Sequence, residues 1–116
     1  MARAATTSDA FNAVAEPQRR EILAFLADRE RSVNEIVDAL EMEQPAVSKR
    51  LRVLREVGLV RMRSEGRRKL YQTNAVALRP LHAWTSEFER FWRHTLTNVK
   101  ARAEAKMSEE EKEKSQ

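Results

Sequence analysis

The chain has 116 residues, a mass of 13.5 kDa and a formal net charge of +4, a size that allows one domain. Charged residues make up 34% and hydrophobic residues 41% of the sequence, which is typical of a folded, water-soluble protein and excludes a disordered tail. Cysteine is absent, which excludes disulfides, thiolate metal sites and cysteine nucleophiles. No apolar run approaches the roughly 20 residues that cross a bilayer. The N-terminus has no apolar signal segment, so we expect a cytoplasmic protein with no membrane partner.

The chain begins with a segment without pattern and two short predicted helices. Residues 1–7 show no periodicity, and we expect them to be flexible. Ser8 or Asp9 is suited to cap a first short helix, since both side chains accept hydrogen bonds from backbone N–H groups. Pro17 suits the first position of a second helix over about residues 17–28, because its missing N–H would lack a partner there anyway.

Two further helices follow, separated by a tight connection at residues 41–43. Ser32 and Glu35 form a capping box at the start of the third helix. Pro45 opens the fourth helix, and Gly58 ends it as a left-handed C-cap. The predicted buried stripe of this fourth helix consists of Val47, Leu51 and Leu54.

A β-hairpin and a long helix complete the predicted domain. The segments 59–64 and 69–73 are predicted strands, and the last helix runs over about residues 75–105. The order α-α-α-α-β-β-α predicts a mainly α protein with a small β-hairpin, a winged helix-turn-helix over residues 8–105. The charged segment 106–116 is expected to be disordered.

Positive charge is concentrated between Gln44 and Gln72, where nine residues are basic and two are acidic. Such a block is typical of proteins that bind a polyanion. Two helices joined by a tight turn, the second of them basic, indicate a helix-turn-helix whose second helix enters the major groove of DNA. We predict DNA contacts from Gln44, Pro45, Ser48, Lys49, Arg50 and Arg52 on this helix and from Arg67, Arg68 and Lys69 on the hairpin. Weaker candidates are Arg55, Arg61 and Arg63.

Four segments resemble the ArsR-type (arsenical-resistance repressor) winged-helix family. Residues 16–23 resemble its "DPTRRxIL" segment, and residues 44–54 resemble its "QPAVSKHLxVL" recognition helix. Residues 57–60 and 65–68 are similar to its "AGLV" and "EGRR" wing segments, and the resemblance covers roughly residues 8–100. It implies a homodimeric DNA-binding transcriptional regulator, usually a repressor released by an effector, that dimerises through its first and last helices.

The sequence departs from this family pattern at two positions. Glu43 stands where relatives often have a small N-cap residue, and Arg50 stands where they often have His. Both changes bear on the choice of DNA sequence. The dimer contacts implied by the resemblance, together with the aromatic character of the last helix, give the candidate interface residues Phe11, Leu81, Trp84, Phe88, Phe91, Trp92 and Leu96.

Metal sensing, which the resemblance raises, finds little support in the residues. The first helix of the helix-turn-helix has no cysteine. His82 and His94 would lie about 18 Å apart on one helix and could not share an ion within one chain. We expect no metal and no cofactor, while an unknown small-molecule effector, with a small apolar pocket among the aromatic rings, stays open.

No set of residues indicates catalysis. The sequence has neither a Gly-rich phosphate loop nor suggestive Ser-His-Asp spacing, so we expect no enzyme. We predict a sequence-specific transcriptional regulator that binds an imperfect palindrome as a homodimer, with helix 44–57 in the major groove and wing 59–73 on the flanking backbone or minor groove. The alternative is a winged-helix interaction module for an acidic protein, which sequence-selective DNA binding would exclude.

Overall fold

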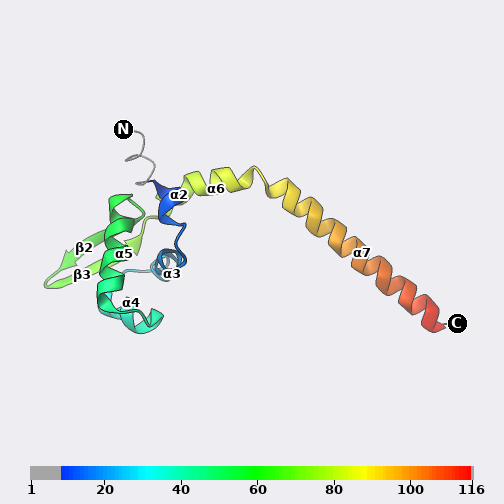
Figure 1. Cartoon of the computed structure of the whole chain (residues 1–116), viewed down its shortest axis with the longest axis horizontal. Helices are drawn as coiled ribbons and strands as arrows, with labels where there is room; N and C mark the ends of the chain where they lie inside the picture. The colour runs from blue at the N-terminus through cyan, green and yellow to red at the C-terminus, as the bar shows by residue number, and fades with distance from the viewer. Residues whose placement is uncertain (1–8, 116) are drawn as a thin grey trace. The chain divides into compact units, whose positions relative to one another are not determined.

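A computed structural model describes residues 9–115, which form helices and a small antiparallel sheet (Figure 1). The first helices are α2 (Ala10–Ala13), α3 (Pro17–Phe25), α4 (Val33–Leu40) and α5 (Gln44–Glu56). The strands are β1 (Arg31–Ser32), β2 (Val60–Glu65) and β3 (Arg68–Thr73). The 3₁₀ helix η1 (Ala75–Leu78), α6 (Arg79–Ser86) and α7 (Glu89–Ser115) follow. The described residues belong to two units, 9–81 and 82–115, and the flexibility predicted for residues 1–7 lies outside them.

Local capping sets the starts of the helices. The carboxylate of Asp9 accepts a hydrogen bond from the Asn12 backbone N–H at 2.8 Å, which caps α2 as predicted. The predicted capping box of α4 is also present: the Ser32 hydroxyl accepts from the Glu35 N–H, and the Glu35 carboxylate accepts from the Ser32 N–H. A proline stands in the first turn of both α3 and α5.

The turn between α4 and α5 depends on one left-handed residue. Glu41, the C-cap of α4, has φ = 53°, a conformation that costs a non-glycine residue roughly 1–2 kcal/mol. The next residue, Met42, is buried in the core and offsets this cost. Gly58 adopts φ = 81° at the end of α5, the conformation expected of a glycine C-cap.

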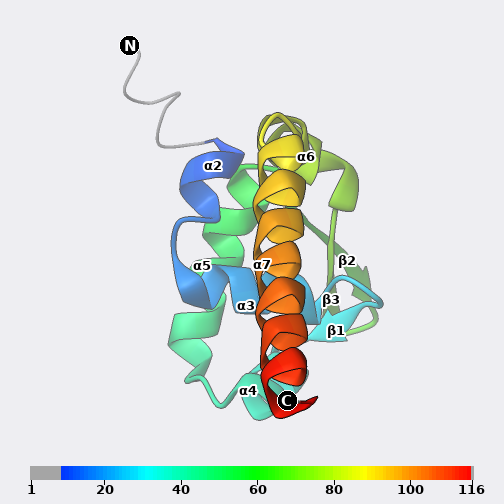
Figure 2. The same cartoon turned by 90° about the vertical axis from the view of Figure 1, so that its right-hand side faces the viewer.

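The core of the first unit joins the helices to the sheet. Figure 2 shows the strands on one side of α3 and α5. The predicted stripe of α5, Val47, Leu51 and Leu54, is fully buried, together with Ile22 and Leu26 of α3, Ile36 of α4, and Leu59 and Val60 at the start of the hairpin.

A buried polar residue, Thr73, fastens the end of β3 to α3. Its hydroxyl donates to the Leu23 carbonyl at 2.7 Å, and its backbone N–H donates to the Leu26 carbonyl at 3.1 Å. Two carbonyls near the C-terminal end of α3 thereby gain partners that the helix itself does not provide.

The sheet has the strand order β1-β3-β2, one strand more than the sequence predicts. Strands β2 and β3 pair up to Glu65 opposite Arg68, so the connecting turn consists of Gly66 and Arg67 alone. The additional strand β1 has only two residues, too few for a pattern in the sequence, and it pairs antiparallel with β3. The predicted mainly α winged helix-turn-helix is otherwise confirmed.

The C-terminal helices differ from the single helix predicted over residues 75–105. The helix is interrupted at residues 87 and 88, between α6 and α7. Instead of the disorder expected for 106–116, α7 continues through Ser115. The reason is that α7 lacks Gly and Pro and is rich in Ala, Glu and Lys, which are good helix formers. Ion pairs one turn apart, such as Arg93 with Glu89 at 2.6 Å, add support.

Candidate nucleic-acid interface

One side of α5 is buried and the other is a row of exposed polar side chains. The buried stripe turns inward, and five of the predicted contact residues are exposed on the helix: Gln44, Pro45, Ser48, Lys49 and Arg52. Arg52 lies four residues after Ser48 and three after Lys49, so that its side chain neighbours both of theirs on one side of the helix. Amide, hydroxyl and guanidinium groups are the donors and acceptors that read base edges in the major groove.

Arg50 is the predicted contact residue that the structure places differently. Its side chain is only 21% exposed, and its Nε donates to the Glu16 carboxylate at the start of α3. A second donor, Nη1, reaches the carbonyl of Ala46 on α5 itself at 3.2 Å. The prediction that Arg50 contacts DNA is not supported by this arrangement, because its guanidinium is engaged inside the protein.

The hairpin brings its basic residues next to the start of α4. Arg67 lies in the two-residue turn, and Arg67, Arg68 and Lys69 are all exposed. They line a shallow cavity of about 300 Å³ together with Ser32, Val33 and Asn34. Figure 1 shows the hairpin extending away from α5, with its tip clear of the body.

Glu35 ties the wing to the helix-turn-helix. Its carboxylate forms ion pairs with Arg68 at 3.4 Å and with Arg31 at 3.8 Å. The hydrogen bond from the Ser32 backbone N–H is the largest cause that lowers the pKa of Glu35 below its ordinary value of 4.5. Burial opposes it, and the Ser32 hydroxyl and the charges of Arg31 and Arg68 lower the pKa further. Glu35 is therefore ionised at neutral pH and offsets part of the charge of Arg68.

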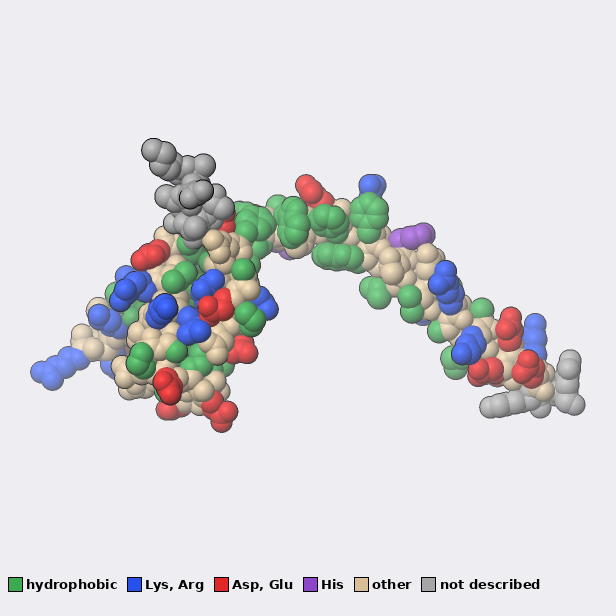
Figure 3. All heavy atoms as spheres, viewed as in Figure 1, with side chains coloured by type: hydrophobic (Ala, Val, Ile, Leu, Met, Phe, Trp, Pro, Cys, Tyr) green, Lys and Arg blue, Asp and Glu red, His purple; other side chains and the backbone are tan. Residues whose placement is uncertain are grey.

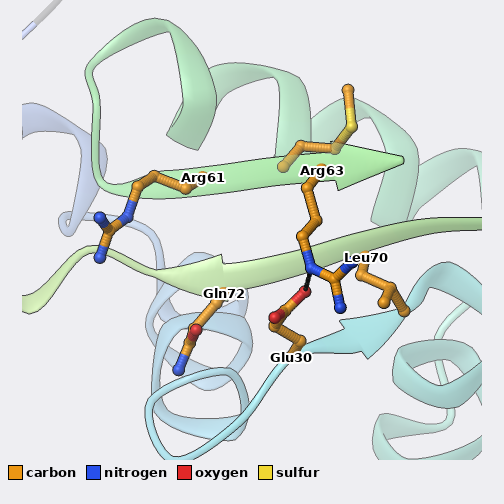
Figure 4. A pocket seen from close by; sticks show the side chains of 6 residues that line it. Glu30, Arg61, Arg63, Leu70 and Gln72 are labelled. Atoms are coloured by element: carbon orange, nitrogen blue, oxygen red, sulfur yellow. Dashed lines mark hydrogen bonds and ion pairs between the residues drawn. The ribbon is translucent and has the colours of Figure 1, made fainter. Parts of the chain in front are cut away.

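The outer side of the hairpin holds a second set of internal ion pairs. A cavity of about 240 Å³ lies there, lined in part by Arg61, Arg63 and Gln72 (Figure 4). Figure 4 shows the Arg63 guanidinium directed at Glu30, which accepts from its Nε at 2.6 Å. The hydrogen bond and charge of Glu30 raise the pKa of Arg63 above its ordinary value, with a smaller contribution from Glu65. The guanidinium of Arg63, a weaker candidate for DNA contact, is therefore engaged within the protein.

The free positive charge is therefore smaller than the sequence indicates. Three of the nine basic residues between 44 and 72 form ion pairs, chiefly with acids from earlier in the chain: Glu16, Glu30 and Glu35. These pairs join residues 33 or 34 positions apart, a separation that leaves no sequence signal. Within residues 9–115, no ion pair involves Lys49, Arg52, Arg55, Arg61, Arg67 or Lys69. Figure 3 shows Lys and Arg side chains gathered over α5 and at the hairpin tip.

The predicted interface residues are mostly exposed and aromatic. Figure 3 shows hydrophobic side chains along α6 and the first part of α7. Trp84 and Phe88 contact each other edge to face at 5.5 Å between ring centroids. The exposed predicted residues are Phe11, Trp84, Phe88, Phe91, Trp92 and Leu96, whereas Leu81 is half-buried. Exposed large apolar side chains in this number are typical of an interaction surface.

Between 9 and 115, no cluster of three or more His, Asp or Glu side chains could hold a metal ion. His82 and His94 have polar neighbours on their own helices, Ser86 and Asn98 respectively. None of the helices described is both long and apolar enough to span a bilayer.

Comparison with known proteins places residues 16–62 in the family described as bacterial regulatory protein, arsR family. The HTH-type transcriptional regulator Rv2034 of Mycobacterium tuberculosis is 36% identical over 88 residues, which are 76% of this chain and 79% of the relative. The HTH-type transcriptional repressor SmtB of the same species is 40% identical over 62 residues, 53% of this chain and 46% of the relative. The transcriptional activator HlyU of Vibrio cholerae is 36% identical over 71 residues, which are 61% of this chain and 66% of the relative.

Solved structures agree on the fold. An ArsR-like transcriptional regulator from Rhodococcus sp. RHA1 matches 86% of this chain and 94% of its own with a TM-score of 0.63, at 24% identity. The family match covers α3 to the first half of β2, which includes the helix-turn-helix and its exposed polar row. The chain belongs to the arsR family of bacterial helix-turn-helix transcriptional regulators.

Proposed function

We propose that this protein is a homodimeric, sequence-specific DNA-binding repressor that recognises an imperfect palindrome. The observation that carries the proposal is α5 itself. Its apolar stripe is fully buried, while Gln44, Ser48, Lys49 and Arg52 are exposed from its first turn onward. A recognition helix of this class places its N-terminal residues against base edges in the major groove.

The hairpin would act as the wing beside this helix. Arg67 and Lys69 are exposed and form no ion pair with any residue from 9 to 115, so their charge is available to phosphates. Contacts of this kind fix the position of the protein on the duplex without reading sequence. Arg68 would contribute less, because Glu35 already offsets its charge.

A second copy of the chain is the partner that the exposed aromatic residues fit best. Phe88, Phe91 and Trp92 are 41%, 55% and 52% exposed. The contact of these apolar side chains with water is unfavourable, and association would remove it. A two-fold dimer presents two copies of α5 to DNA, which predicts half-sites about one helical turn, or a near multiple, apart. The relatives differ in their named roles: SmtB is named a repressor and HlyU an activator. We assign repression because a bound dimer can repress transcription simply by occupying a promoter.

The test of base reading is Arg52→Ala, measured on a duplex recovered by selection and on a scrambled duplex. If Arg52 makes a bidentate contact with guanine, the variant loses about 1–3 kcal/mol on the selected duplex and little on the scrambled one. Arg102→Ala, which removes the same charge from α7, serves as the control. An equal loss of affinity on both duplexes would assign Arg52 to the phosphate backbone. Salt-dependent binding to an acidic protein, with no selected duplex, would favour the interaction module.

A further inference from the structure

The carboxylate of Glu16, between α2 and α3, holds two arginines from different parts of the chain. Arg50 of α5 donates its Nε to one carboxylate oxygen, and Arg19 of α3 donates Nη1 to the other at 3.1 Å. Both guanidinium side chains are largely buried, with 21% and 16% exposed. Arg50 also bonds the Ala46 carbonyl of its own helix. The second turn of α5 is thus fastened to the start of α3.

Arg19 and its neighbour Arg20 in α3 also close the end of α2. Arg19 donates Nε to the Ala13 carbonyl at 2.6 Å and Nη2 to the Asn12 carbonyl at 3.2 Å. Arg20 donates to the carbonyls of Val14 and Ala15 at 2.8 and 3.1 Å. The last carbonyls of a helix have no partners within it, and cations are favourable there. Glu16 therefore connects α2, through Arg19, with α5, through Arg50.

Arg50 is the basic residue of α5 whose charge is paired with an acidic residue of the protein itself. Lys49 and Arg52, its neighbours on the helix, are exposed and form no ion pair within the described chain. Arg50 would have to leave both Glu16 and Ala46 before it could reach a phosphate or a base. The part-buried Glu16 would then lose one of its two arginine partners, which would oppose that movement.

We propose that Glu16 and Arg50 are positioning residues for DNA recognition. Their ion pair sets the rotation and the tilt of α5 against the α2–α3 corner, and thereby aims Gln44, Ser48 and Arg52. The proposal rests on the proposed function, in which α5 is the recognition helix. Neither residue touches DNA in this account.

Glu16→Gln separates this role from direct contact, because the two accounts predict opposite signs. If Arg50 were a DNA contact held back by Glu16, removing an acidic charge and freeing the guanidinium would strengthen binding. In the positioning role, Glu16→Gln and Arg50→Gln each weaken binding to the selected duplex by about tenfold, and the double variant loses no more than either single variant. Binding to a scrambled duplex changes by less than about twofold in all three.

The salt dependence provides the second readout. Titrations of the full chain at several salt concentrations should give the same slope for wild type, Glu16→Gln and Arg50→Gln, since no phosphate contact is lost. Glu21→Gln, which removes an exposed carboxylate of α3 without an ion pair in the described chain, is the matched control and should leave selectivity unchanged. Binding is measured well below the melting temperature of each variant. If Glu16→Gln fails to fold, Glu16→Asp replaces it. This variant keeps the charge with a shorter reach and should again weaken binding to the selected duplex.

Three results would overturn the proposal. They are unchanged or tighter binding of Glu16→Gln to the selected duplex, a salt slope reduced by about one unit in Arg50→Gln, and additive losses in the double variant. If wild type binds selectively and any of these occurs, only the positioning role fails. If wild-type protein binds no duplex at all, the proposed function fails with it.

Discussion

Replacing Arg67 with alanine tests whether the hairpin tip contacts the DNA backbone. Arg67 shares a two-residue turn with Gly66, is exposed, and has no ion-pair partner within residues 9–115. Its neighbour Arg68 is instead bonded to Glu35. Of Arg67 and Arg68, Arg67 is therefore the one whose whole charge is available to a phosphate.

The magnitude follows from counterion release. One phosphate contact contributes about 0.9 to the slope of log affinity against log salt concentration on duplex DNA. Between about 50 and about 200 mM salt, the ratio of wild-type to Arg67→Ala affinity should therefore fall by about 3.5-fold. Because the contact carries no sequence information, the change should be equal on selected and scrambled duplexes.

The assay is fluorescence anisotropy with labelled duplexes at four salt concentrations within this range. Arg102→Ala, which removes an equal charge from α7, should leave the slope unchanged. Circular dichroism establishes that each variant is folded. A slope for Arg67→Ala that equals that of wild type would refute the wing contact, whatever the change in affinity at a single salt concentration.

Three other predictions concern the dimer and the stability of the body. Phe91→Glu should yield monomers in sedimentation, because it places a charge in the proposed interface. Thr97→Glu, which changes an exposed polar position of α7, should leave the protein dimeric. A Phe91→Glu variant that stays dimeric would remove Phe91 from the interface. Glu35→Gln should unfold at a lower temperature than wild type at neutral pH. Since the folded-state pKa of Glu35 is lowered, this difference should shrink as pH falls below 4.5, and a difference that does not depend on pH would contradict it. Thr73→Val should cost about 1–2 kcal/mol in urea unfolding, because the Leu23 carbonyl loses its hydroxyl donor; an unchanged unfolding midpoint would show that this bond contributes nothing.

The sequence predicted the parts of this fold that local chemistry determines. The buried stripe of α5, the capping box of α4 and the left-handed Gly58 each depend on residues within a few positions of one another. Helical periodicity alone therefore separated the exposed polar row of α5 from its core side.

The features that the sequence did not predict depend on distant partners or on competing local preferences. The pairing of Arg50 with Glu16 spans 34 residues, and it engages the guanidinium of one predicted DNA contact within the protein. The strand β1 exists only because β3 pairs with it. The helical state of 106–115 reflects helix propensity that outweighs the dense charge of this segment, which the sequence interpretation read as disorder.

Selection of bound sequences from a random duplex pool, with purified protein at physiological salt, tests the central claim most directly. The account predicts enrichment of an inverted repeat whose half-sites lie about one helical turn, or a near multiple, apart, and loss of that enrichment with Arg52→Ala. Retention of duplexes without any enriched motif, or retention of none, would contradict sequence-specific recognition by α5.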